Sequence, residues 1–444
     1  MSDLYYRPTV YQPHGGGSGG GKRTGVCRPD GRCVRDDQGL FNPLGLTLMW
    51  SMQGIQWDPD DHWQNNIDWA VEKRFDFVRP LTEVKWDGNR LLDPQKQAWW
   101  PDVLRRMMDL CYAAGMRLGV TLRGKGTDVD HLWLAREVAR AIADGRTHNV
   151  LACEMENEYS NDGDPLEELM DMARIMSGLI PNMLALSTPG NAEEAARIKQ
   201  ACLDLALEMF ILHTERSPAD HGWRDVRQSY DFNNFRPLVG ADWEGPGPGS
   251  SGSTLTSPLH LAMKRFIAIM CGSPIFILHC GTGVFGDGNP GGTGPRPANF
   301  WEIDNIDAIC AAVRNIDALL PEGVSNWTVA NTQWQPPNPV APFQPHHHWE
   351  GDAENDDKGR RNNGINKAYS ALAPDGRVVQ APCGVREHVL MTASYPLREV
   401  TVYDPLSLQP VPGFVDRSFN AGESMDLPGG GWDAQVAYII HGRR

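Results

Sequence analysis

The sequence predicts an α/β protein: a (β/α)8 TIM barrel followed by a small C-terminal antiparallel β-sandwich domain. Short apolar segments alternate with amphipathic helical segments from residue 42 onward, and this alternation is typical of a parallel sheet covered by helices. Eight such units occur, and eight units in roughly 250 residues predict a closed barrel. After residue 323 the pattern changes to short β-rich runs between turn residues, which predicts antiparallel strands.

Each barrel unit is predicted from the spacing of its apolar residues. In the segment 101–115, for example, Val103, Met107 and Leu110 share one helical face, and Gly115 ends the helix. The predicted strands are 42–50, 75–81, 117–122, the run that begins at 150, 183–187, 208–213, 236–242 and 274–279. The predicted helices are 61–74, 101–115, 129–144, 165–179, 192–206, 223–230, 258–271 and 301–320. An open doubly wound sheet is the alternative, but no glycine-rich phosphate-binding sequence follows the first strand to favour it.

The chain is expected to divide into four parts. Residues 1–24 form a flexible segment containing GGGSGGG, which cannot bury a core. Residues 25–324 form the barrel with an N-terminal hairpin, residues 325–366 a linker or loop rich in Pro, Asn and Asp, and residues 367–444 the β-sandwich.

The nine cysteines include one pair with a local turn between them. Cys27 and Cys33 flank the turn signal Pro29-Asp30-Gly31 and can face each other across a hairpin. A disulfide is therefore possible there, although an oxidising compartment is not established by the sequence.

Composition excludes some classes of function. The chain carries 56 Asp and Glu against 41 Lys and Arg, for a formal net charge of -15, and it lacks the clustered basic residues that nucleic-acid binding uses. A neutral or basic substrate fits this charge better. No apolar run approaches the ~20 residues that a membrane-spanning helix needs, and the first residues do not match a secretory signal peptide. We therefore expect no nucleic-acid or membrane partner, while compartment and oligomeric state stay open.

The segment 149–162, NVLACEMENEYSND, organises the functional prediction. It begins as an apolar run and then places Glu154, Glu156 and Glu158 at alternate positions, so a strand would put all three on one face. Carboxylates are rarely buried without a partner or a task. A buried strand whose end carries acid is therefore the first candidate for a catalytic site.

Polar side chains follow most of the other predicted strands as well. In a (β/α)8 barrel the active site lies where the strands end and the following loops begin. The residues at these ends are Arg79, Arg123, Asn157 with Glu158, His213 with Glu215, Asp242 with Glu244, and His279. This set predicts a pocket with two opposed carboxylates. Glycoside hydrolysis needs two: one protonates the leaving oxygen, and the other attacks the anomeric carbon or activates water.

Three of these segments resemble the clan A glycoside hydrolases, and family 5 in particular. Glu154-Met155-Glu156-Asn157-Glu158 is similar to the fourth-strand pattern Trp-Glu-(Leu/Ile)-x-Asn-Glu, which ends in the acid/base. The run 236–244, RPLVGADWE, resembles the seventh strand, which ends in the nucleophile. Phe77-Val78-Arg79 is similar to the second-strand arginine that keeps the nucleophile ionised.

The sequence also departs from this family at three strand ends. Arg123 stands where many relatives have His, and His213-Thr214-Glu215 stands where His-x-Tyr is usual. The eighth strand ends in His279-Cys280 rather than in Trp. These departures leave the identity of the sugar nearest the cleaved bond open.

The resemblance implies a retaining O-glycosyl hydrolase that cleaves β-glycosidic bonds of an oligo- or polysaccharide by double displacement. Glu158 is then the acid/base and Glu244 the nucleophile, with Asp242 as an alternative nucleophile. Repulsion from Glu244 would keep a proton on Glu158, and Arg79 would keep Glu244 ionised. The alternative to an enzyme is a catalytically inactive glycan-binding or structural barrel module of a larger assembly.

The carbohydrate substrate is the expected partner, and no metal or other cofactor is expected. The predicted substrate-binding residues are Arg79, Asn157, His213, Trp243, His279, Trp50 and Trp301. Core hydrogen bonds would equally explain His213 and His279, and a structural ion pair would explain Arg79. The triplet His346-His347-His348 lies in a Pro-rich loop, so we expect it to be solvated rather than to bind metal.

Overall fold

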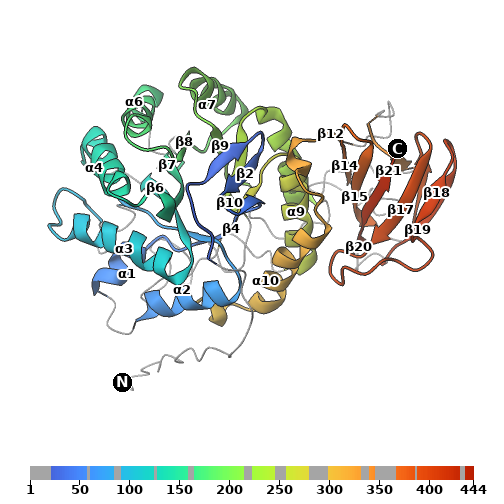
Figure 1. Cartoon of the computed structure of the whole chain (residues 1–444), viewed down its shortest axis with the longest axis horizontal. Coiled ribbons are helices and arrows are strands. Elements are labelled where there is room, and N and C mark those ends of the chain that lie inside the picture. The colour runs from blue at the N-terminus through green and yellow to red at the C-terminus, as the bar shows by residue number, and fades with distance from the viewer. Residues whose placement is uncertain are drawn as a thin grey trace.

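A computed structural model of the chain shows a barrel joined to a β-domain (Figure 1). The structure describes residues 22–57, 61–84, 92–124, 128–158, 165–214, 223–245, 257–279, 299–331, 340–345, 367–385, 388–430 and 436–444. Among these residues no helix is both long enough and apolar enough to cross a membrane.

Eight parallel strands form the barrel, and all eight coincide with predicted strands. They are β4 (Leu44–Thr47), β5 (Phe77–Arg79), β6 (Arg117–Arg123), β7 (Val150–Glu156), β8 (Met183–Ser187), β9 (Met209–Leu212), β10 (Val239–Gly245) and β11 (Ile275–Leu278). Their order is β8-β7-β6-β5-β4-β11-β10-β9. The two end strands, β8 and β9, contact each other, so the sheet closes on itself. The predicted (β/α)8 barrel is thereby confirmed.

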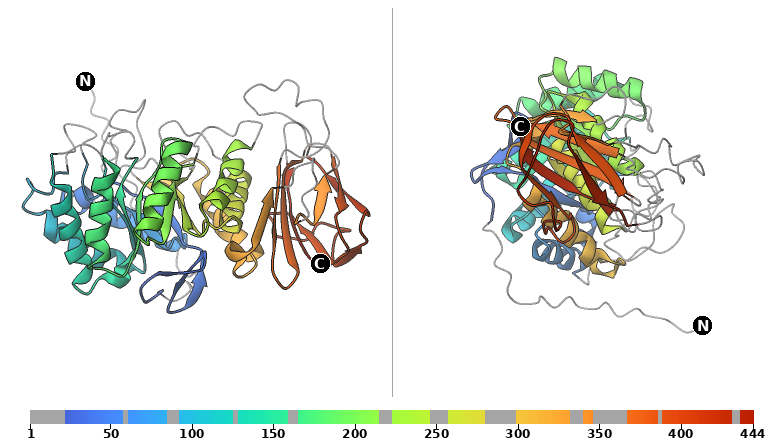
Figure 2. Two further views of the ribbon diagram at one scale, coloured as in Figure 1. Left: turned by 90° about the horizontal axis from the view of Figure 1, so that it is seen from above. Right: turned by 90° about the vertical axis from the view of Figure 1, so that its right-hand side faces the viewer.

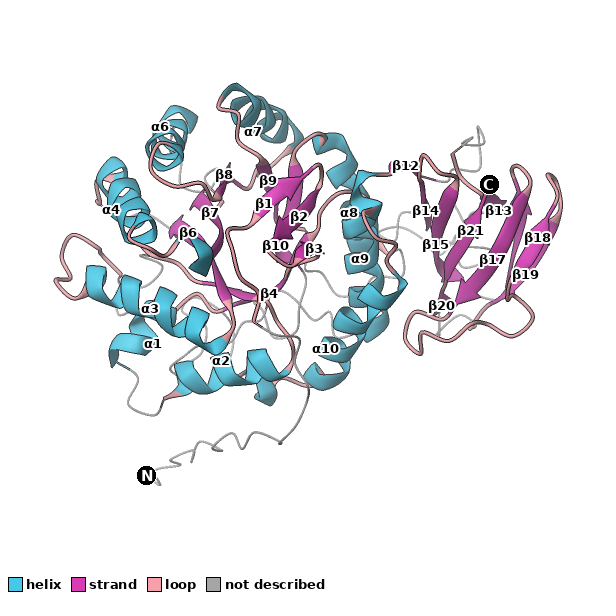
Figure 3. Cartoon of the chain, in the orientation of Figure 1, coloured by secondary structure: helices cyan, strands magenta, loops and turns pink. Residues whose placement is uncertain are grey.

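Helices surround this sheet on its outer side (Figure 3). They are α1 (Ser51–Trp57), α2 (His62–Glu72), α3 (Trp100–Ala114), α4 (His131–Ala143), α6 (Leu166–Ser177), α7 (Ala192–Asp204), α8 (Arg224–Tyr230), α9 (Pro258–Met270) and α10 (Ile306–Asn315). Gly115 ends α3 with a left-handed φ of 97°, as its position predicts. The predicted helix 301–320 is instead divided into η3 (Phe300–Glu302), α10 and η4 (Ile316–Leu319), because Asn305 has a φ of 61°.

Large aromatic rings fill the barrel interior. The rings of Phe77 and Trp243 stack with their centroids 5.8 Å apart. Two glycines make room for them: a Cβ at Gly119 would lie 2.5 Å from the Trp243 ring, and one at Gly45 would lie 2.5 Å from the Phe77 ring. The interior is therefore a packed core and not a channel, so any site must lie at an end of the barrel.

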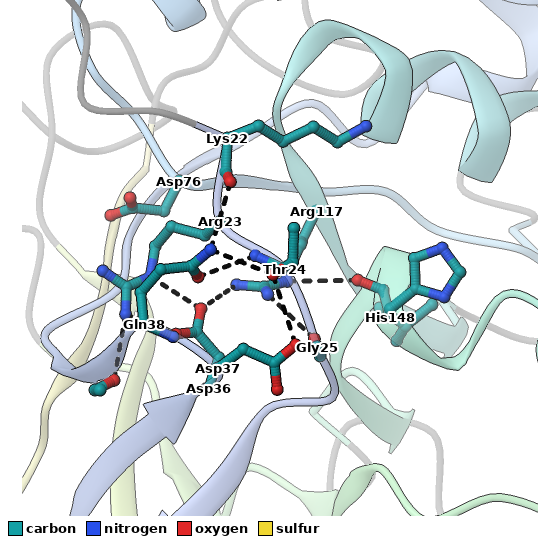
Figure 4. A network of polar contacts seen from close by, with 12 residues as sticks. Lys22, Arg23, Thr24, Gly25, Asp36, Asp37, Gln38, Asp76, Arg117 and His148 are labelled. Carbon is teal, nitrogen blue, oxygen red and sulfur yellow. Dashed lines mark hydrogen bonds and ion pairs between the residues drawn. The ribbon is translucent and has the colours of Figure 1, made fainter.

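An N-terminal β-meander covers the end at which the barrel strands begin (Figure 2). It consists of β1 (Arg28–Asp30), β2 (Cys33–Asp36) and β3 (Gly39–Phe41), one strand more than the predicted hairpin. Figure 4 shows the polar contacts that hold it: Asp36 accepts hydrogen bonds from Arg23 at 2.6 and 2.7 Å and from Arg117, the first residue of β6, at 3.0 Å. Cys27 and Cys33 are both buried free thiols, so the possible disulfide is absent here.

Arg32, at the tip of the meander, anchors it to the other side of the barrel. Its guanidinium donates to the backbone carbonyls of Leu238, Phe232 and Gly272, each at 3.1 Å. Burial lowers the pKa of Arg32 to about 9. Gly272 has a φ of +97°, and a Cβ there would lie 2.0 Å from the Arg32 guanidinium carbon, so this glycine makes the close approach possible.

The C-terminal domain is a sandwich of two antiparallel sheets, as predicted. Its strands are β12 (Thr328–Asn331), β13 (Phe343–Pro345), β14 (Lys367–Leu372), β15 (Arg377–Val385), β16 (His388–Ala393), β17 (Leu397–Tyr403), β18 (Arg417–Phe419), β19 (Ser424–Pro428), β20 (Val436–Ala437) and β21 (Ile439–Arg443). One sheet has the order β12-β14-β15-β21-β17-β18, with β20 also paired to β15, and the other has the order β13-β16-β19. The range 325–366 therefore contains more than a linker, since β12 and β13 belong to the sandwich.

The larger sheet of the sandwich is buried on both faces. One face packs against the smaller sheet, and the other joins the core of the barrel through residues such as Tyr369, Val379 and Ile439. Helix α9 lies against this second face, and the rings of Tyr230 and Tyr369 stack across the junction with centroids 5.3 Å apart. The two domains therefore share a continuous apolar core.

Candidate active site

Buried polar residues lie at the end of the barrel where strands β5, β6 and β7 finish. Arg79 is the last residue of β5, while Thr121 and Arg123 lie near the end of β6. On β7, Glu154 is in register with Thr121, and Glu156 with Arg123. Alternation along the strands places these side chains on the same side as Phe77 and Gly119, toward the barrel interior.

Arg79 is fully buried and is the centre of a hydrogen-bond network. Its Nη2 donates to Glu154 Oε2 and to Asn157 Oδ1, both at 2.7 Å. Its Nε donates to Thr121 Oγ1 at 2.8 Å, and Thr121 in turn donates to Glu154 Oε2 at 2.7 Å. Trp243 Nε1 also donates to Thr121 Oγ1, at 3.2 Å. The network therefore links β5, β6, β7 and β10 and fixes the side chain of Asn157.

A second buried ion pair lies one step closer to the barrel mouth. Arg123 Nη1 donates to Glu156 Oε1 at 3.1 Å, and Arg123 Nε lies 3.9 Å from Glu83 Oε2. Both glutamates are fully buried. His131, at the start of α4, has a pKa lowered by burial and then by the nearby charge of Arg123. One guanidinium thus lies close to two carboxylates.

Glu158 lies beyond the strand and faces a different part of the rim. Strand β7 ends at Glu156, and Glu158 has a left-handed φ of 56°. Its Oε1 lies 2.9 Å from His213 Nδ1, and its side chain is 32% exposed. The predicted common face therefore holds for Glu154 and Glu156, whereas the bend at Glu158 turns its carboxylate toward the end of β9. Strained non-glycine backbone of this kind is concentrated at functional sites.

Asp242 and Trp243, neighbours on β10, face opposite sides. Asp242 is fully buried and accepts hydrogen bonds from Thr214 Oγ1 at 2.8 and 2.9 Å, with Lys264 Nζ of α9 3.5 Å away. Lys264 also donates to Thr214. The contacts with Thr214 and Lys264 hold the Asp242 carboxylate on the helix side of the sheet, away from the Arg79 network. We therefore do not propose Asp242 as a nucleophile.

Glu244 follows on the same strand, which runs to Gly245. The pairing of β10 with β11 changes register between Asp242 and Gly245, so strict alternation does not fix the direction of Glu244. Its side chain lies outside the described residues, as do Glu215 and the triplet His346-His347-His348.

The predicted substrate-binding aromatics are more buried than a sugar-stacking role requires. Trp243 is fully buried inside the barrel, where its ring packs on Phe77, so it supports the network and offers no face to a ligand. Trp50 is 6% exposed and belongs to the main core. Trp301 is half-buried on η3. His279 is buried just after β11, at the same end of the barrel as Glu158.

Sequence reasoning missed three buried polar residues: Thr121, Glu83 and Lys264. The signal that could have identified Thr121 is its position two residues before Arg123, which puts both side chains on the same face of the strand. Lys264 could have been noticed as one of two adjacent charged residues, with Arg265, in the mostly apolar sequence of α9. Across the described part of the chain, no group of three or more His, Cys, Asp and Glu side chains is arranged to hold a metal ion.

Two solved structures share this fold over nearly the whole chain. One, described as "Glycoside hydrolase", superposes with a TM-score of 0.59 at 10% sequence identity over 95% of this chain and 96% of its own. The other, a glycoside hydrolase family 5 protein from Bacteroides vulgatus ATCC 8482, gives a TM-score of 0.59 at 10% identity over 95% of this chain and 92% of its own. No protein family model and no curated protein matches the sequence.

These comparisons define the class of fold. The chain shares its fold with a structure described as a glycoside hydrolase and with the family 5 protein, and the resemblance inferred from the sequence is confirmed at that level. At 10% identity the likeness concerns the fold, and the chemistry has to be argued from the site itself.

Proposed function

We propose that this protein is a glycoside hydrolase that cleaves β-glycosidic bonds of an oligo- or polysaccharide with retention of configuration. The observation that carries the proposal is the pairing of Glu158 with His213 at 2.9 Å, at the same barrel end as the buried Arg79 and Asn157 network. Glu158 is partly exposed, as a group that meets a substrate must be. Glu244 is the proposed second carboxylate, on the strand that also supplies Trp243 to the network.

The proposed reaction has two steps. The Glu244 carboxylate attacks the anomeric carbon while the Glu158 carboxyl gives its proton to the departing glycosidic oxygen. This forms a glycosyl ester on Glu244 and releases the first product. Glu158, now ionised, then takes a proton from water, whose oxygen attacks the anomeric carbon and releases Glu244. Retention by this route needs the two carboxyl groups about 5–5.5 Å apart.

The surrounding residues prepare these groups. His213 Nδ1 lies 2.9 Å from Glu158 Oε1, and this contact orients the Glu158 carboxyl. Asn157 precedes Glu158, and its side chain is held by Arg79, which positions the start of the bend. A neutral polysaccharide suits the formal net charge of -15 better than a polyanion, which the protein would repel.

The test is hydrolysis of aryl β-glycosides and of β-glucan, mannan, xylan and chitosan by the wild type and two variants. Glu158→Gln and Glu244→Gln should each lower kcat by at least ~10²-fold, because each removes a group that bonds or transfers a proton in the transition state. With an aryl glycoside whose leaving group needs no proton, added azide should restore turnover of Glu158→Gln, since a small anion needs no general base.

Glu167→Gln, on the exposed first turn of α6, is the matched control and should keep full activity. Inactivity of the folded wild type on every substrate, with glycan binding retained in all variants, would leave the binding module as the function.

A further inference from the structure

A cavity of about 680 Å³ lies outside the barrel strands, between α7 and the segment formed by α8 and η2 (Asp231–Phe235). The N-terminal turns of α7 form one wall, and the end of β9 forms the floor. Because α7 begins and β9 ends at the mouth of the barrel, the cavity lies on the same face of the molecule as Glu158. Ligand pockets in proteins commonly have volumes of about 300–1,000 Å³, so this one has room for a small molecule of one to three rings.

The lining of the cavity combines apolar surface with amides. Ala195, Leu212 and Phe235 supply apolar area, while Asn191, Gln228 and Asn234 supply side-chain amides. An amide both donates and accepts hydrogen bonds, as the hydroxyl groups of a sugar do. Lys199 and Asp231, which carry opposite charges, also line the cavity, and Lys199 donates to the backbone carbonyl of Asn234 at 2.7 Å. This chemistry favours an uncharged ligand with apolar faces and hydroxylated edges.

The floor of the cavity is connected to the candidate active site by two side chains. His213 lines the cavity, and its Nδ1 lies 2.9 Å from Glu158 Oε1. Thr214 also lines it and donates to Asp242, two residues before Glu244 on β10. A ligand in the cavity would therefore touch residues that contact Glu158 and the strand of Glu244.

We propose that this cavity is a second saccharide-binding site, which adjoins the candidate active site and shares His213 with it, and that it takes a neutral mono- or disaccharide. The proposal that a sugar binds in the cavity is argued only from the residues that line it. An effect of that binding on turnover, transmitted through His213, rests on the proposed hydrolase function.

The binding test uses Glu244→Gln protein, so that no sugar is consumed, and calorimetric titration with glucose, mannose, cellobiose and mannobiose. At least one of these should bind, and Ala196→Trp should weaken its binding at least tenfold, because Ala196 lines the cavity and an indole there would occupy it. Asn234→Ala should weaken binding about fivefold by removing one amide. Arg197→Trp places the same ring on the next residue of α7, which does not line the cavity, and should leave the affinity unchanged.

The outcomes separate the two proposals. Equal affinity in Ala196→Trp and its parent, both natively folded by circular dichroism, would place the sugar elsewhere and overturn the site, as would failure of all four sugars to bind. In the wild type, a saturating amount of the bound sugar should change kcat on an aryl glycoside, and Ala196→Trp should abolish that change. Binding that depends on Ala196 in a protein that hydrolyses nothing would support the cavity and refute the hydrolase.

Discussion

The hydroxyl group of Thr121 uses its whole hydrogen-bonding capacity. It accepts from Arg79 Nε and from Trp243 Nε1, and it donates to Glu154 Oε2. A hydroxyl has one donor and two acceptor sites, so none is left over. Arg79 and Glu154 are both fully buried and 2.7 Å apart, so this arrangement pairs two charges away from water. The network is therefore rigid, which suits residues that must hold Asn157 in one position.

The Arg79 and Glu154 pair should show strong thermodynamic coupling. Glu154→Gln and Arg79→Met should each lower the free energy of unfolding by about 3–5 kcal/mol, because each removes one member of a fully buried ion pair. The double variant should lose less than the sum of the two, because both single variants break the same contact. Urea denaturation of the four proteins measures this cycle, and additive losses would contradict it.

An exposed ion pair provides the control for that cycle. Asp109 accepts from Arg146 at 2.9 Å, but the Asp109 side chain is 53% exposed. Asp109→Asn should therefore cost less than about 1 kcal/mol.

Alternation along the strands predicted which polar residues are buried. It did not predict which side chains these residues contact. Arg79, Glu154 and Glu156 could be placed on inward faces from the sequence. Thr121 could not be recognised as the link between them, because threonine is common in strands for reasons of shape alone. Glu158 escaped the pattern because its backbone leaves the strand conformation. Both residues depend on contacts between strands, which the period of one strand does not encode.

At the scale of elements, the β-meander β1–β3 is tied to the barrel at opposite sides by two arginines. Arg117 binds Asp36 from the start of β6, while Arg32 reaches the carbonyls near α9 and β10. The meander thus holds together the end of the barrel where the strands begin, which is opposite the candidate active site. Its role is structural, since the strand beginnings of such barrels serve stability rather than catalysis.

Loss of the Arg32 anchor should destabilise the protein without changing the active site directly. Arg32→Met removes three hydrogen bonds to buried backbone carbonyls, although the carbonyl of Gly272 still accepts from the backbone N–H of Gly240 at 2.9 Å, and we expect a loss of about 3 kcal/mol in the free energy of unfolding. Arg35→Met, on the same meander, removes an ion pair with Asp30 whose side chains are 50% and 47% exposed, and should cost less than about 1 kcal/mol. Chemical denaturation of both variants distinguishes them, and equal losses would contradict the anchoring role.

The elements that the sequence predicted best are those with long, regular periodicity. Eight strands and the helices α2, α3, α4, α6, α7 and α9 follow the apolar spacing closely. The segment 301–320 kept helical spacing but is interrupted at Asn305, whose left-handed conformation is a local property that periodicity does not reveal. Strands β12 and β13 are too short for a pattern, and they form because partners far along the chain pair with them.

At the scale of the whole molecule, His441 lies where the sandwich meets the barrel. It belongs to β21, whose Ile439 is part of the core shared with the barrel, and it packs edge-on against the Tyr403 ring with the ring centroids 5.3 Å apart. Burial lowers the pKa of His441 below its ordinary value of 6.5. His441 therefore binds a proton less tightly in the folded protein than in the unfolded chain.

This difference predicts a stability that depends on pH. Above pH 6.5 His441 is neutral in both states, and its contribution is fully present. As the pH falls below 6.5, the unfolded chain binds more protons at this position, so the free energy of unfolding should decrease until the lower pKa of the folded state is passed. His441→Gln cannot titrate and should lose less stability over the same range. Denaturation curves from pH 8 to pH 5 that run parallel for the two proteins would contradict the prediction.

Strands β12 and β13, which precede the other strands of the sandwich in the chain, determine where this protein can be divided into fragments. β12 is the edge of one sheet and β13 the edge of the other, and both come before residue 346 in the chain. A fragment that begins at residue 367 would therefore expose an unsatisfied backbone edge on each sheet, and such edges recruit strands from other molecules. The sandwich can be transferred as a complete unit only together with the segment that leaves the barrel. A fusion or truncation that keeps both sheets complete therefore has to begin before Thr328.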